Sequence, residues 1–113
     1  MNKTIITGRI VDMPEVKGVN DTTVMNFTIA NNDGDFKDKE TGEWQKRPVF
    51  IEASIWGVKD KRLEYFQKNL QKGTKVLIEG VCSARAFIGS DNKAVGVLQI
   101  TVADLEILEL KKE

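Results

Sequence analysis

The stretch PVFIEASIWG, residues 48–57, determines how the fold is interpreted, because its side chains separate onto two different faces. Successive side chains of a β-strand point to opposite sides. One set is wholly apolar, as a core requires, and consists of Val49, Ile51, Ala53 and Ile55. The other set combines two rings with two polar side chains and consists of Phe50, Glu52, Ser54 and Trp56. These rings are expected to meet solvent or a ligand, or alternatively the edge of the core or a subunit contact.

Composition indicates one soluble globular domain. The chain has 113 residues, of which 41% are hydrophobic and 30% charged, which is ordinary for a soluble domain. No apolar run has the length of a membrane span, and the first residues do not lead into a signal-peptide core. A single cysteine, Cys82, excludes an internal disulfide and favours a reducing compartment. We therefore expect a cytoplasmic protein.

The absence of histidine excludes several kinds of catalytic site. With one cysteine and no histidine, a single chain cannot build the usual structural zinc site or a Ser-His-Asp or Cys-His arrangement. Carboxylates alone could still build a magnesium site. The acidic residues, however, are scattered singly through loops, as in residues 33–43, and are typical of solvated loop charge. We expect no enzymatic activity, no metal and no cofactor.

The charge balance permits a nucleic-acid partner without indicating one. There are 17 basic and 17 acidic residues, so the net charge is zero and binding of a polyanion by overall charge is disfavoured. Basic residues are nevertheless concentrated locally in residues 59–75. A polyanion would have to bind at such local patches.

The order of the expected elements predicts an all-β OB-fold. Strands are expected at 4–12, 22–31, 48–57, 75–87 and 94–103, the last continued by 105–110. Residues 59–70 have helical periodicity and end at Gly73 as the C-terminal cap, while 31–47 is a long polar connection. The result is a five-stranded Greek-key barrel with one short helix between the third and fourth strands, as a single domain over residues 1–113. We expect Phe27, Tyr65 and Phe66 in its core and Cys82 facing inward.

Aromatic rings alternate with cations at two further places. Ser83, Arg85 and Phe87 share one face of the fourth strand, and the connection 31–47 interleaves Phe36 and Trp44 with lysines and an arginine. Unpaired bases stack on exposed rings for about 1–3 kcal/mol each, while cations follow the phosphates. Since every base offers a π-face, this pattern predicts binding of single strands of any sequence.

The chain resembles the single-stranded DNA-binding protein (SSB) family of bacteria and phages. The resemblance covers nearly the whole chain and lies in MNKTIITGRIVDMPEV, NFTIAN, FKDKETGEWQ, the strand ending IWG, and EYFQKNLQKGTKVLIEG. It implies protection of single-stranded DNA during replication, recombination or repair. It also implies a homo-oligomer, a tetramer or a dimer, in which the first strand forms an intersubunit edge.

The resemblance and the residue pattern together nominate two sets of site residues. Phe36, Phe50, Trp56 and Phe87 fall at stacking positions of the family, and Lys3, Lys37 and Arg85 at basic positions of its DNA path. The full stacking set is Phe36, Trp44, Phe50, Trp56 and Phe87. The full backbone-contacting set is Lys3, Arg9, Lys37, Lys39, Lys46, Arg47, Lys61, Arg62, Lys72 and Arg85.

The end of the chain departs from the family pattern, and one alternative interpretation stays open. The chain ends soon after the barrel, so we expect no C-terminal tail domain and no partner recruited through a tail. Either the chain is truncated or it is a tailless form. The competing interpretation is an OB-fold primosomal or assembly subunit with weak single-strand binding, and the filled set of stacking positions favours the first interpretation.

Overall fold

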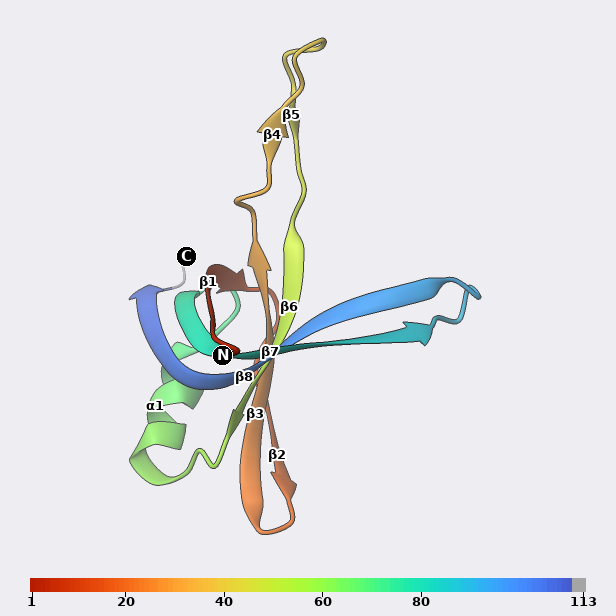
Figure 1. The fold of residues 1–113 in the computed structure, drawn as a ribbon. Helices are drawn as coiled ribbons and strands as arrows, with labels where there is room; N and C mark the ends of the chain where they lie inside the picture. Colours follow the sequence, from red (N-terminus) through yellow and green to blue (C-terminus); the bar gives the residue numbers. More distant parts are fainter. Residues whose placement is uncertain (111–113) are drawn as a thin grey trace.

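The computed structural model describes residues 1–110, so the expectation that the chain ends without a tail falls on 111–113, outside the described residues. Eight strands and one helix make up this part (Figure 1). In chain order they are β1 (Thr4–Ile10), β2 (Glu15–Val19), β3 (Thr22–Asn31), β4 (Phe36–Lys37), β5 (Trp44–Gln45), β6 (Val49–Trp56), α1 (Asp60–Asn69), β7 (Lys75–Ile88) and β8 (Ala94–Glu109). Within residues 1–110, no helix has the length and apolarity needed to cross a membrane.

The pairing of the strands follows the predicted OB-fold. The main sheet has the order β1-β7-β8-β6-β3-β2, and β1 also pairs with β3 at Arg9↔Ala30 and Ile10↔Ile29. Only the β6–β8 pair in this sheet is parallel among the described strands. Helix α1 lies between β6 and β7, which are the third and fourth of the five long strands that the sequence predicts. The predicted all-β OB-fold class, with one short helix between the third and fourth long strands, is therefore confirmed.

The core forms where the apolar faces of the strands meet α1. Ile51, Ala53 and Ile55 of β6 are buried, as their alternation predicts, and Phe27 and Phe66 are buried with them. Val49, the first residue of β6, is exposed and does not join them. Cys82 is half-buried and packs against the core, so its inward orientation is as expected.

The expectation that Tyr65 belongs to the core is wrong. Its side chain is exposed, whereas that of Phe66 is buried. Adjacent residues of an α-helix point about 100° apart, so the two rings cannot both face the core. Leu63, Phe66 and Leu70 share the buried side of the helical segment instead, at the spacing of an amphipathic helix.

The helix also ends earlier than the predicted cap at Gly73. Leu70 is already extended, and its N–H donates to the Phe66 carbonyl at 2.8 Å, which closes the last helical turn. Gly73 lies in the following turn, where the Thr74 N–H donates to the Gln71 carbonyl at 3.0 Å. The φ of Gly73 is +94°, a conformation that favours glycine, so it serves this turn rather than the helix end.

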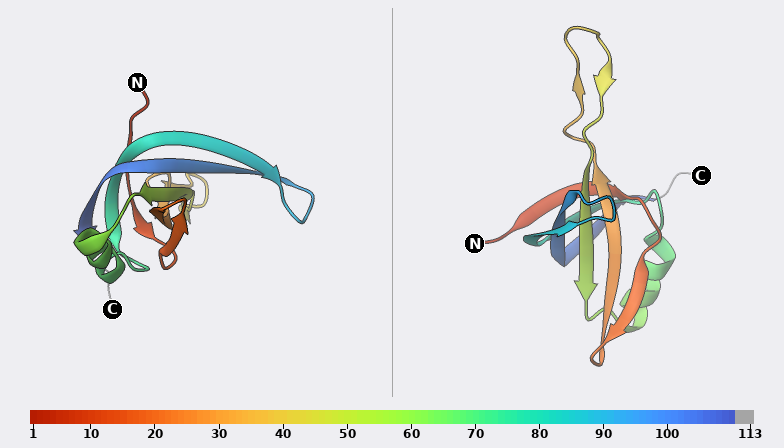
Figure 2. Two further views of the ribbon diagram at one scale, coloured as in Figure 1. Left: turned by 90° about the horizontal axis from the view of Figure 1, so that it is seen from below. Right: turned by 90° about the vertical axis from the view of Figure 1, so that its right-hand side faces the viewer.

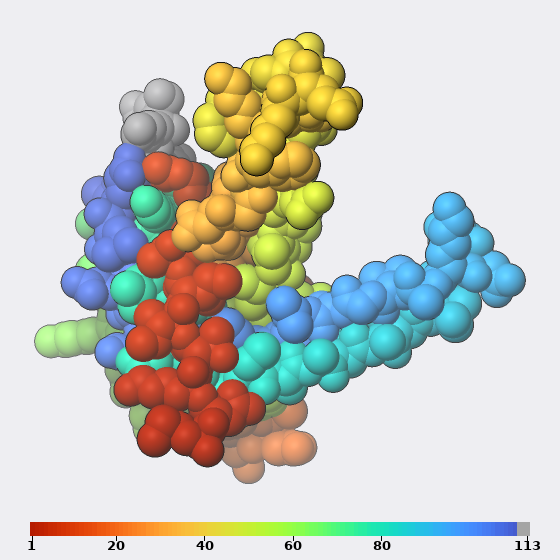
Figure 3. Space-filling model, turned by 45° about the horizontal axis from the view of Figure 1, so that its top comes forward, coloured from red at the N-terminus to blue at the C-terminus, as the bar shows by residue number. Residues whose placement is uncertain are grey.

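Two projections leave the body of the fold (Figure 2). The first is the hairpin, residues 36–45, in which β4 and β5 pair within the segment that was expected to be a connection without strands. The second is the arm, residues 83–88 of β7 paired with 94–99 of β8. Figure 3 shows the hairpin and the arm as two separate projections of the surface, with residues of β6 between them.

Candidate nucleic-acid interface

The outer face of β6 carries two exposed rings with polar side chains between them. Phe50 is 56% exposed and Trp56 50% exposed. Glu52 and Ser54 lie between them on the same face and are half-buried. The two rings are six residues apart, which is about 20 Å along an extended strand.

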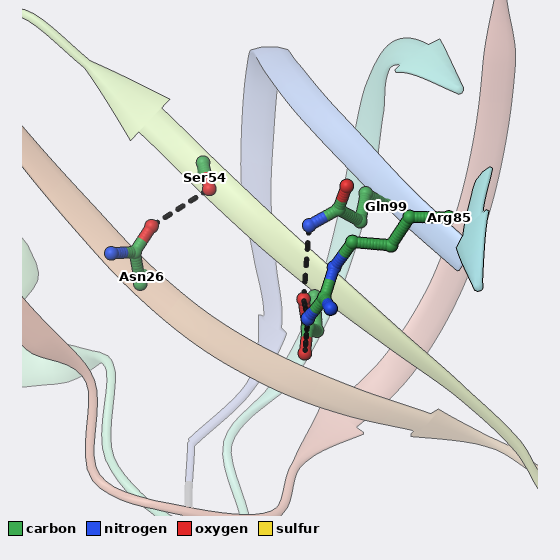
Figure 4. A network of polar contacts seen from close by, with 5 residues as sticks. Asn26, Ser54, Arg85 and Gln99 are labelled. Atoms are coloured by element: carbon green, nitrogen blue, oxygen red, sulfur yellow. Dashed lines mark hydrogen bonds and ion pairs between the residues drawn. The ribbon is translucent and has the colours of Figure 1, made fainter. Parts of the chain in front are cut away.

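Neighbouring strands surround this face with further polar groups. Asn26 of β3 lies opposite Ser54, and the Ser54 hydroxyl donates to Asn26 Oδ1 at 2.7 Å (Figure 4). Gln99 of β8 is paired with Glu52, and its Nε2 donates to Glu52 Oε2 at 3.0 Å. These contacts fix the polar side chains between the two rings.

The arm brings a third ring and a cation to this face. A terminal nitrogen of Arg85 donates to both Glu52 oxygens at 3.2 Å, which ties the arm to β6 (Figure 4). The same guanidinium lies 5.2 Å from the centre of the Phe87 ring. Phe87 is 44% exposed. Arg85 is thus shared between an aromatic ring and a carboxylate.

The hairpin carries the remaining two predicted rings. Trp44 is 69% exposed and lies opposite Lys37 in the β4–β5 pair. Phe36 is 39% exposed, and the guanidinium of Arg47 lies 4.3 Å from the centre of its ring.

The lysines of the hairpin and its base are accessible to a polyanion. Lys37, Lys39 and Lys46 are exposed. Within residues 1–110, none of the three forms an ion pair with a carboxylate. Rings and available cations are therefore interleaved on the hairpin.

A groove of about 410 Å³ crosses β3 and β6 at Glu52 and Ser54, the polar residues between Phe50 and Trp56. Its lining includes the carboxylates of Asp12, Glu15 and Glu52. No lysine or arginine lines it. This groove therefore disfavours phosphate and offers hydrogen-bond acceptors instead.

Two predicted cations are held by carboxylates of the chain itself. The Lys3 ammonium lies 2.8 Å from Glu79 Oε1, and this hydrogen bond, together with the charge of Glu79, raises the pKa of Lys3. Arg9 lies 3.1 Å from Glu109 Oε2 and also donates to the Gly73 carbonyl at 2.9 Å.

Three other predicted cations are not brought to the aromatic face. Lys61 and Arg62 lie on α1, and Lys72 lies in the turn after it. In Figure 1, α1 lies on the opposite side of β3 and β6 from the arm. The guanidinium of Arg62 lies 5.1 Å from the centre of the Phe66 ring, so it covers the core instead.

Sequence reasoning did not identify Asn26, Gln99 or the Glu52–Arg85 ion pair as parts of this surface. The alternation of β3 does place Asn26 on its polar face. Only the registers of β3, β6, β7 and β8 bring these residues together. Among the described residues, no group of three or more His, Cys, Asp or Glu side chains could hold a metal.

The chain is similar to bacterial proteins named single-stranded DNA-binding proteins. Single-stranded DNA-binding protein 3 of Listeria innocua is 28% identical and matches 99% of this chain. The match spans 66% of the Listeria protein, just under two thirds of its length. Single-stranded DNA-binding protein 2 of Clostridium acetobutylicum is 30% identical over 100% of this chain and 80% of its own length.

Solved structures resemble the fold. A structure titled Plasmodium falciparum SSB complex with ssDNA has a TM-score of 0.69 and 23% identity, and covers 96% of both chains. The small single-stranded DNA-binding protein from Streptomyces coelicolor has a TM-score of 0.71 at 13% identity, covering 93% of this chain and 92% of that one. The model of the single-strand binding protein family matches residues 1–108. Since this match covers almost the whole sequence, the chain belongs to the single-strand binding protein family.

Proposed function

We propose that this protein binds single-stranded DNA without sequence preference. The observation that carries the proposal is the set of exposed rings on β6, the hairpin and the arm, with cations beside them. Duplex DNA hides the faces of its bases, whereas a single strand can stack them on exposed rings. Membership of the single-strand binding protein family supports the same function.

Base stacking and phosphate contacts divide the work between two groups of residues. Each base stacked on a ring contributes about 1–3 kcal/mol. The phosphates follow Lys37, Lys39, Lys46 and Arg47, which lie beside the rings of the hairpin. Such binding forms and breaks no covalent bond, so we propose a non-enzymatic role without a cofactor. It coats exposed strands, prevents their re-annealing and protects them from nucleases during replication, recombination or repair.

The protein acts as a homo-oligomer in this proposal, a tetramer or a dimer. One edge of β1 pairs with β7 along residues 4–9. The other edge of β1 pairs with β3 only at Arg9 and Ile10. Ile5 on this strand is 59% exposed. A strand edge with free backbone groups is suited to pairing with a second copy. A single strand could then pass over several protomers, which explains binding by a chain without net charge.

We place this activity in the cytoplasm of a bacterium, or in the host cytoplasm for a phage protein. The unit that binds is one OB-fold domain. Recruitment of other proteins through a C-terminal tail is not part of the proposal.

Titration with poly-dT tests the proposed function. Light scattering gives the number of subunits with and without the strand, and tryptophan fluorescence reports on Trp44 and Trp56. We expect an oligomer that binds poly-dT tightly with a large fluorescence change. Weak binding with unchanged fluorescence would instead support an assembly subunit of the OB-fold class.

A further inference from the structure

The contact between Glu52 and Arg85 occupies the centre of the aromatic face. One guanidinium nitrogen lies 3.2 Å from both carboxylate oxygens, and the guanidinium also covers Phe87 at 5.2 Å from the ring centre. The side chains of Arg85 and Glu52 are 47% and 42% exposed. The ion pair is therefore open to solvent and to any strand that lies on the rings.

This pair has little to contribute to the stability of the fold. Exposed ion pairs are screened by water and salt, and they lose side-chain entropy when they form. A pair of this kind breaks readily when another anion competes for the arginine. Phosphate is such a competitor, because guanidinium and phosphate form charge-assisted hydrogen bonds of the same geometry as guanidinium and carboxylate.

Glu52 remains held when Arg85 leaves it. The amide of Gln99 donates to Glu52 Oε2 at 3.0 Å from the neighbouring strand β8. The carboxylate thus keeps its position between the rings, and its charge stays within the screening length of a phosphate bound at Arg85. No lysine or arginine lines the groove beside Glu52, so no cation of this lining replaces Arg85 as its partner.

We propose that Glu52 is an internal competitor of the DNA backbone: it occupies Arg85 in the free protein and must be displaced by phosphate when a strand binds. The proposal rests on the proposed function and adds a residue that lowers the affinity for the strand. Glu52 keeps binding weaker and more readily reversible than the rings and cations alone would make it. Removal of the Glu52 charge should therefore raise the affinity for the strand, and a loss of affinity would contradict the proposal.

The decisive variant is Glu52→Gln, which removes the charge and keeps an oxygen that can accept from Gln99. Glu64→Gln is the matched control, because it makes the same change of net charge on the exposed surface of α1. Poly-dT affinity is measured by fluorescence titration over a range of salt concentrations, and thermal unfolding checks that each variant is folded.

We expect Glu52→Gln to bind about two- to fivefold more tightly per site, the range that an exposed ion pair represents. The plot of log affinity against log salt does not steepen by the roughly 0.7 of a further phosphate contact, because Arg85 meets the same phosphate in both proteins. Glu64→Gln changes neither quantity appreciably. In an Arg85→Gln background, Glu52→Gln loses most of its effect, because the arginine that it frees is absent.

Each other result overturns the proposal in a recognisable way. If Glu52→Gln binds like Glu64→Gln, the carboxylate does not compete with phosphate. If it binds more weakly than the unchanged protein, Glu52 positions Arg85 for binding. If the unchanged protein does not bind poly-dT, the proposed function itself fails; binding by the unchanged protein without a gain in Glu52→Gln rejects this inference alone.

Discussion

The guanidinium of Arg47 lies 4.3 Å from the centre of the Phe36 ring, at the base of the hairpin. The backbone N–H of Arg47 donates to Asp35 Oδ1 at 2.8 Å, so the two sides of the hairpin base are joined. A guanidinium over a ring is attracted by its π-electrons and covers one face. The other face of Phe36 can take a base while Arg47 meets a phosphate.

We therefore expect Phe36 and Arg47 to act as one unit. Phe36→Ala and Arg47→Gln should each weaken poly-dT binding, and the double variant should lose less than the sum of the two. The coupling should be about 0.5–1 kcal/mol, as for a cation–π pair at an exposed site. A double-mutant cycle measured by fluorescence titration tests this, and strictly additive losses would show that the two residues act independently.

The rings on β6 should contribute affinity without changing salt dependence. Phe50→Ala and Trp56→Ala should each cost about 1–3 kcal/mol of binding, or about 5- to 150-fold in affinity, because each removes one stacked base. Tyr65→Ala removes an exposed ring from α1 and serves as the control. Equal losses for all three variants would contradict a specific stacking role for β6.

The exposed lysines of the hairpin and its base should determine the salt dependence. Lys37→Gln, Lys39→Gln and Lys46→Gln should each reduce the slope of log affinity against log salt by about 0.7, since each removes one phosphate contact. Lys61→Gln, on α1 away from the aromatic face, should leave the slope unchanged. A smaller slope in Lys61→Gln than in the hairpin variants would place the phosphates over the helix instead.

Gly80 should be required for the close approach of β7 and β8. A Cβ added at this residue would overlap the Thr101 carbonyl, whereas one added at Gly96 on the arm meets no atom within 4 Å. Gly80→Ala should therefore lower the free energy of unfolding by about 1–3 kcal/mol or more, and Gly96→Ala should not. Urea denaturation of both variants at one protein concentration measures the difference, and equal stabilities would refute the steric argument.

The long strands and the helix could be predicted because their periodicity reflects burial directly. Ile51, Ala53 and Ile55 alternate with polar or aromatic neighbours, and the structure buries all three. Strands of two residues such as β4 and β5 are too short to show any period. Their pairing depends on turn hydrogen bonds, as where the Glu40 N–H donates to Asp38 Oδ1 at 2.8 Å.

The composition of the site could be predicted, but its arrangement could not. Exposed rings follow from the polar neighbours of Phe50 and Trp56 on one strand. The position of a cation depends instead on which strands pair and in which register. Arg85 meets Glu52 because β7 and β6 both flank β8, while Lys3 meets Glu79 across the β1–β7 pair. Nothing in the local sequence around Arg85 or Lys3 shows which carboxylate each of them meets.

The break in the ladder below the hairpin has a consequence for its backbone amides. Strand pairing stops at Asn31↔Val49 and resumes only at Phe36↔Gln45, so rotation of the segments between them disrupts no rung of the sheet. Local opening then requires the loss of only the short β4–β5 ladder. In the unliganded protein, amide protons of residues 36–45 should exchange with deuterium orders of magnitude faster than those in the middle of β3. Bound poly-dT should slow their exchange, because a strand stacked on Phe36 and Trp44 would hold the hairpin in one orientation.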